Sequence, residues 1–122
     1  MSDPQTSDEL TSVAELRAIV ERFVAERDWR KFHTPKNLSM ALAIEAAELM
    51  EHFQWLSNED ATAVVGQPAE LAAVGEELAD VVCYACAMAN ALGLDISTLV
   101  RDKMLKNAVK YPADQCQGKY KL

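Results

Sequence analysis

MALAIEAAELME, residues 40–51, and VGEELADVVCY, residues 74–84, are the two stretches that decide the fold. Both consist of small and aliphatic residues with acids at a spacing of three, as Glu45 and Glu48 in the first and Glu77 and Asp80 in the second. At about 100° per residue, each pair lies roughly 60° apart on one face of a helix. The sequence therefore predicts two apolar helices that place four carboxylates on inward faces.

The rest of the chain also has the period of helices, and no segment alternates as a strand does. Four sites carry helix start signals: Ser12 with Glu15 as a capping box, Thr34-Pro35, Pro68 and Asp95. Gly93 is a helix stop signal. We expect helices over 13 to about 28, 36–55, 69–92 and 96 to about 110, with an irregular stretch at 57–68 that includes at most a short helix. In the helix over 36–55, the core stripe should hold Leu38, Ala41, Leu42, Ile44, Ala47 and Leu49.

The length and composition indicate one domain over residues 1–122, with tails at 1–11 and 113–122. Half of the 122 residues are apolar, which suffices for a core, and we expect homo-oligomerisation to complete it. The predicted fold is thus an all-α bundle of four to five helices that forms a dimer or a tetramer. A net charge of −7 argues against general nucleic-acid binding, and no stretch has the roughly 18 apolar residues that a membrane span needs.

Three cysteines without a signal-peptide pattern indicate reduced thiols and a cytoplasmic protein. Cys83 and Cys86 form a C-x-x-C motif inside an apolar helix. No second pair of ligands completes a zinc site, so we expect both to be small buried hydrophobes.

A single E-x-x-E motif is usually a solvated helix face, but two such pairs on consecutive apolar helices indicate a site. Buried like charges cost several kcal/mol each unless a cation compensates them. Carboxylate oxygens suit Mg²⁺, with Mn²⁺ as a possible substitute. A di-iron site would need Glu-x-x-His pairs, and the nearest histidine, His52, is four residues after Glu48.

Aromatic and basic residues accompany the acids. Trp55 is seven residues beyond Glu48, and Tyr84 is four beyond Asp80, so each shares a helix face with an acid and can stack on a nucleobase. Lys103, Asn107 and Lys110 form a stripe suited to phosphate oxygens. Taken alone, the aromatics fit a core and the lysines fit a solvated helix end.

Together these motifs resemble the MazG-like all-α nucleotide pyrophosphohydrolases, and most closely their dCTP pyrophosphatase branch. The resemblance rests on Glu45-Ala-Ala-Glu48, a 28-residue gap, and Glu77-Leu-Ala-Asp80. It extends over about residues 13–112 through further similar segments: 23–29, 32–38, 51–55 and 103–112.

The resemblance implies Mg²⁺-dependent hydrolysis of a nucleoside triphosphate, dCTP or a related or modified dNTP, to the monophosphate and pyrophosphate. Metal would be bound by Glu45, Glu48, Glu77 and Asp80. Glu45, Glu48 and Glu51 are the catalytic candidates, and which of them accepts a proton is left open. The substrate-binding candidates are Trp29, His33, Asn37, Trp55, Tyr84, Lys103, Asn107, Lys110 and Tyr111. Sites would form between helices of neighbouring subunits.

The chain departs from the family at two places. Val20 stands where cytosine-preferring vertebrate members have a histidine, which leaves the base preference open. Ile44 and Ala47 replace glycines that precede the helix glutamates. Two rival functions follow: a broad-specificity dNTP house-cleaning enzyme, and a non-catalytic helical module that uses metal to set its assembly state.

Overall fold

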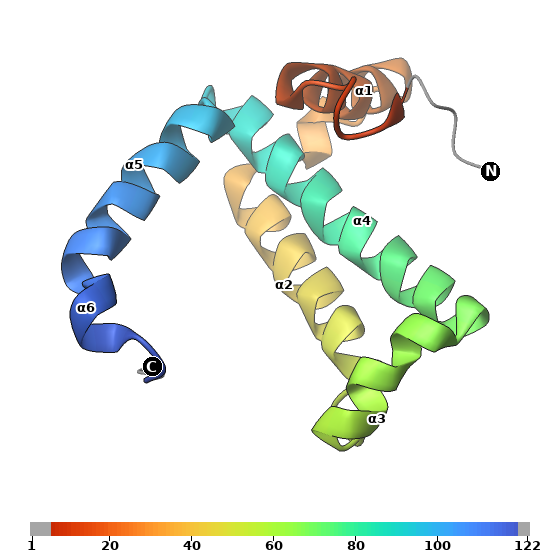
Figure 1. The fold of residues 1–122 in the computed structure, drawn as a ribbon. Coiled ribbons are helices and arrows are strands. Elements are labelled where there is room, and N and C mark those ends of the chain that lie inside the picture. Colours follow the sequence, from red (N-terminus) through yellow and green to blue (C-terminus); the bar gives the residue numbers. More distant parts are fainter. Residues whose placement is uncertain (1–5, 120–122) are drawn as a thin grey trace.

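The computed structural model describes residues 6–119, and in this part of the chain every regular element is a helix (Figure 1). The elements are α1 (Val13–Glu26), η2 (Arg30–Phe32), α2 (Pro35–Glu51), α3 (Asn58–Thr62), η3 (Ala63–Gly66), α4 (Pro68–Leu92), α5 (Ile96–Lys110) and α6 (Ala113–Cys116). The all-α prediction is confirmed for these residues. Residues 1–5 and 120–122, which belong to the expected tails, lie outside the described part.

Polar side chains cap four of the helices, three of them at the predicted residues Ser12, Thr34 and Asp95 and one at Ser57. Ser12, Thr34, Ser57 and Asp95 each accept a hydrogen bond from the backbone N–H three residues on, at 3.1–3.2 Å. These bonds satisfy N–H groups that have no partner within the helix. Gly93 adopts φ 65° and ends α4 in the left-handed conformation that glycine tolerates.

Three boundaries differ from the prediction. α1 ends at Glu26 and α2 at Glu51, both earlier than expected. The backbone turns at Asp28, with φ 54°, soon after α1. After Glu51 the hydrogen bonds change to the i→i−3 pattern, from His52 to Leu49 and from Phe53 to Met50. Residues 113–116, expected in a tail, form the short helix α6.

The core lies where α2 and α1 pack on α4. α2 runs antiparallel beside α4, α1 crosses the C-terminal half of α4, and α3 and η3 close the other end (Figure 1). Leu38 is the most buried large side chain at 2% exposure, and Val24, Val64, Cys86, Ala87 and Ala89 complete the core. Cys86 is therefore the buried hydrophobe expected, whereas Cys83 is exposed.

The predicted core stripe of α2 was only partly right. Leu38 is buried, but Ile44 is 58% exposed, because no element in the described part of the chain covers that side of the helix. α5 shows the same feature more strongly. It leaves α4 at an angle of 103°, diverges from α2 and contains no buried residue (Figure 1).

Among residues 6–119, no single helix combines the length and the apolarity that crossing a bilayer requires.

Candidate active site

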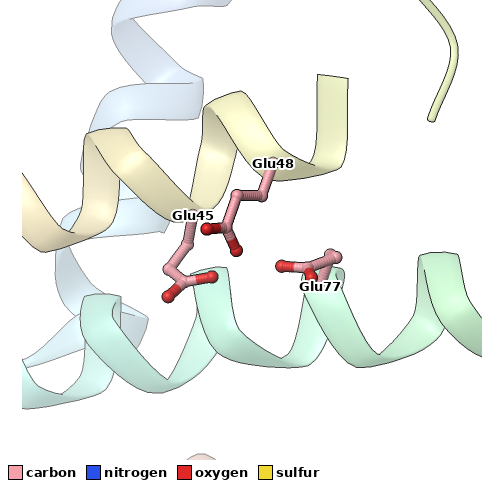
Figure 2. Close-up of side chains that lie close together, drawn as sticks. All are labelled: Glu45, Glu48 and Glu77. Carbon is pink, nitrogen blue, oxygen red and sulfur yellow. The ribbon is translucent and has the colours of Figure 1, made fainter. Parts of the chain in front are cut away.

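Three glutamates meet between α2 and α4. Glu45 and Glu48 lie one turn apart on α2 and point toward α4, from which Glu77 points back (Figure 2). One carboxylate oxygen from each lies within 4.8 Å of the others. The i, i+3 spacing on α2 and the antiparallel packing of the two helices bring the acids together.

The carboxylates of this cluster lack partners that would stabilise their negative charges. Oε2 of Glu45 and Oε2 of Glu77 are both buried and have no hydrogen-bond partner. Burial, followed by interactions with Glu48, Glu77 and Asp80, raises the pKa of Glu45 from 4.5 to about 7. Burial likewise raises the pKa of Glu77, with Glu48 and Asp80 adding to the effect. Three acids therefore share a space that disfavours their charges.

A hard divalent cation fits this cluster. Such a cation prefers oxygen ligands. The buried Oε2 atoms of Glu45 and Glu77 have no hydrogen-bond partner and are therefore available to bind it. The ion pairs of the described residues lie elsewhere, within α1 and the segment that follows it. Glu45, Glu48 and Glu77 are therefore the residues that would hold the ion.

Asp80, the fourth predicted ligand, lies beside this group and is not one of the three converging carboxylates. Its charge nevertheless contributes to the raised pKa of Glu45 and of Glu77. Asp80 also lines a pocket next to the cluster. It thus links the acids to the pocket.

That pocket, here called the first pocket, has a volume of about 300 Å³ between α1, the segment after it and α4. Trp29, His33 and Tyr84 give it aromatic walls, and Asp80 lies at its acidic side. The remaining lining is Ile19, Val20, Phe23, Val24, Cys83 and Ala87. A flat, partly apolar ligand such as a nucleobase fits these walls.

The position of Trp29 depends on a sharp turn after α1. Asp28 has φ 54°, and the Trp29 N–H then donates to the carbonyl of Val24 at 3.0 Å. The indole packs edge-on against Phe23, with ring centroids 5.8 Å apart. This turn directs Trp29 back over α1 and into the first pocket.

A profile of the MazG-like family matches residues 40–121. The chain belongs to the MazG-like family. The match contains all three converging glutamates and Asp80, whereas Trp29 and the α1 wall of the first pocket precede it.

Named relatives agree with the assignment. The chain is 40% identical to dCTP pyrophosphatase 1 of Rattus norvegicus over 107 residues, which is 88% of this chain and 63% of that protein. It is 40% identical to dCTP pyrophosphatase 1 of Homo sapiens, over 84% of this chain and 60% of that one. The chain thus spans about three-fifths of the length of these curated relatives.

A crystal structure of a pyrophosphatase from Archaeoglobus fulgidus superposes with a TM-score of 0.72 at 40% identity. The match covers 81% of this chain and 91% of that one. The two chains therefore share both the fold and a substantial part of their sequence.

Other predicted residues of this MazG-like chain lie away from the acids. Glu51 ends α2, and Trp55, in the turn after it, is 87% exposed. Asn37 donates to the carbonyl of Phe32 at 3.0 Å and stabilises the start of α2 instead of facing the cluster. These positions do not contribute to the first pocket in a single chain.

The basic stripe is also remote from the cluster, because α5 diverges from α2. Lys103, Asn107 and Lys110 lie on α5, and the Lys110 ammonium sits 5.2 Å from the ring centroid of Tyr111. Within residues 6–119, none of these four predicted substrate ligands forms an ion pair or a hydrogen bond with an acidic side chain.

The sequence analysis did not assign Ile19, Phe23, Cys83 and Ala87 to the pocket. Periodicity does not distinguish a helix face that packs against a neighbour from one that lines a cavity. Phe23, at 47% exposure, shows the difference. Its signal in the sequence is its place at the start of the segment 23–29, which resembles the family and ends at Trp29.

Proposed function

We propose that this chain hydrolyses a nucleoside triphosphate, dCTP or a related or modified dNTP, to the monophosphate and pyrophosphate, with Mg²⁺ as cofactor. The single observation that carries the proposal is the pair of buried, unpartnered oxygens of Glu45 and Glu77 beside an aromatic pocket. The names of the relatives and of the Archaeoglobus fulgidus pyrophosphatase support the same reaction.

Mg²⁺, when bound, would neutralise phosphate charge and activate water for in-line attack on the α-phosphorus. Glu45, Glu48 and Glu77 would hold it, and Asp80 extends the acidic surface toward the first pocket. Trp29 and Tyr84 hold the base by stacking, and His33 borders it. A glutamate that keeps an unpaired oxygen can accept the proton of the attacking water.

The phosphates need positive charge, which we propose a second copy of the chain supplies. α5 exposes Leu105, Val109 and Met104 together with its lysines, and Val109 is 81% exposed. The chain has 9825 Å² of accessible surface, against about 6,500 Å² expected for a compact monomer of this length. An oligomer would bury this excess and bring Lys103, Asn107 and Lys110 of one chain to the acids of another.

The cytoplasm is the compartment we propose. Cys83, Cys86 and Cys116 are all free thiols, which suits a reducing environment.

The test is a panel of triphosphates incubated with the purified protein, with Mg²⁺ or with EDTA, and analysed by anion-exchange chromatography. We expect dCTP to give dCMP and pyrophosphate only when Mg²⁺ is present. Glu48→Gln should lose turnover, whereas Glu59→Gln, an exposed acid on α3, should keep it. Formation of dCDP and phosphate, or turnover in EDTA, would contradict the proposal.

The same panel separates the rival functions. Similar kcat/KM values for many bases would indicate a broad house-cleaning enzyme. A non-catalytic assembly module would neither turn over any triphosphate nor bind a non-hydrolysable analogue in the presence of Mg²⁺.

A further inference from the structure

A second pocket adjoins the first at the end farther from the acids. Its volume is about 280 Å³, close to that of the first pocket, so it has room for much more than a methyl group. The two pockets share four lining residues: Val20, Val24, His33 and Ala87. Any base held in the first pocket therefore has a neighbouring cavity along one of its edges.

The second pocket differs from the first in its polar wall. Besides the shared residues, its lining includes Glu21 and Arg30, with Asn90, Ala91 and Pro35. Arg30 binds Glu21 through both Nε and Nη2, and both contacts use Oε1 of the carboxylate. Within residues 6–119, Oε2 of Glu21 makes no recorded hydrogen bond, so it remains an acceptor.

A pair of hydrogen bonds holds this cavity open. Arg17 Nε donates to Asn90 Oδ1 at 3.0 Å, and Asn90 Nδ2 donates to the Arg17 carbonyl at 3.1 Å, both partly buried. This reciprocal contact joins α1 to α4 and fixes their spacing at the second pocket. The spacing of the two helices that form this cavity is therefore set before a ligand binds.

We propose that the second pocket is a subsite for an arm attached to the nucleobase, which rests on the proposed function. The arm would have an alkyl stem of a few atoms and a neutral hydrogen-bonding tip. Val20, Ala87 and Ala91 contact the stem. The tip donates to Glu21, and because the charges of Glu21 and Arg30 offset each other, a neutral tip fits better than a charged one.

The experiment compares three substrates with the Mg²⁺-loaded full chain: dCTP, 5-(3-hydroxypropyl)-dCTP and 5-butyl-dCTP. The two arms have equal numbers of heavy atoms and differ in the hydroxyl. We expect kcat/KM for the hydroxypropyl substrate to match that for dCTP and to exceed that for the butyl substrate about tenfold, as one hydrogen bond to a charged group predicts.

Two variants test the assignment of the cavity. Ala91→Phe should fill the second pocket and lower kcat/KM for both arm-bearing substrates at least about tenfold, while dCTP is unaffected. Glu21→Met should abolish the preference for hydroxypropyl over butyl and leave dCTP unchanged. Ala69→Phe is the matched control, because Ala69 is exposed on α4 and lines none of the described pockets; it should change nothing.

The kinetic results distinguish a failure of the subsite proposal from a failure of the proposed function. If the wild type turns over dCTP but rejects both arm-bearing substrates, or if Ala91→Phe leaves their kcat/KM unchanged, the subsite proposal is wrong and the proposed function stands. If no triphosphate is hydrolysed, the proposed function fails and the subsite falls with it.

Discussion

Glu45 and Glu77 face each other across α2 and α4, and each has one buried oxygen without a partner. Without a cation, their mutual repulsion destabilises the fold. Glu77→Gln should therefore raise the melting temperature in EDTA by a few degrees. The same change should remove the stabilisation that Mg²⁺ gives the wild type and lower kcat about 100-fold or more.

Glu76→Gln is the control for that experiment, since Glu76 is the exposed neighbour of Glu77 on α4. Differential scanning fluorimetry with and without Mg²⁺ measures both effects. A Glu77→Gln protein that Mg²⁺ still stabilises would show that the ion binds elsewhere.

The raised pKa of Glu45 also predicts how stability depends on pH. Because this pKa is about 7 in the folded protein and ordinarily 4.5, the folded state binds more protons between these values. The metal-free protein should therefore lose stability as pH rises from about 5 to 7.5 and change little above that. Urea unfolding in EDTA at pH 5.5 and pH 8 measures the difference. Glu45→Gln should reduce it, and an equal slope in that variant would argue against Glu45 as its source.

Asp28 occupies a backbone conformation that few residues tolerate. At φ 54°, a β-branched side chain clashes with its own backbone, so Asp28→Val should lower the free energy of unfolding by about 1–2 kcal/mol and weaken nucleotide binding through Trp29. Asparagine tolerates the same φ, so Asp28→Asn removes only an exposed ion pair with Lys31. This variant should change the free energy of unfolding by less than about 1 kcal/mol. Equal effects in both variants would assign the loss to the ion pair.

At the scale of the element, α5 is held at its start by Asp95 and has no buried residue to hold it elsewhere. Asp95 accepts from the N–H of Thr98 at 3.1 Å and from its hydroxyl at 2.7 Å, and these bonds lower the pKa of Asp95. Asp95→Ala should cost about 1 kcal/mol of local helix stability. Faster amide exchange confined to the first turn of α5 would measure it, and Asp95→Ser should restore protection.

For the whole molecule, the glutamate cluster lies between α2 and α4, whereas Lys103 and Lys110 lie on α5, which diverges from α2. If a second copy brings them together, a Glu48→Gln chain mixed with a Lys103→Met chain should regain activity, although each alone is inactive. After unfolding and refolding together at equal amounts, a dimer with shared sites should recover about a quarter of wild-type activity. Lys106→Met, on the same helix outside the stripe, should be active alone.

No recovery in the mixture, with an oligomer confirmed by light scattering, would place the acids and Lys103 in the same chain's site. A monomer by light scattering would contradict the oligomer itself.

Features of this protein that depend on neighbours along the chain can be predicted from the order of its residues. Capping bonds and the i, i+3 spacing of Glu45 with Glu48 act within a turn or two, so residue order is enough to predict them. It also indicated a cation, since the cost of gathered carboxylates does not depend on the details of packing.

Which of these residues come into contact depends on how the helices pack. The packing places Glu77 beside Glu45 and Glu48, and it places Asp80 at the edge of the first pocket. It also exposes the apolar face of α1 as one wall of that pocket. It also directed α5 away from α2, which separated Lys103 from the acids. Such outcomes depend on the angles and distances between helices, and these are set by packing among residues far apart in the chain, which no local pattern encodes.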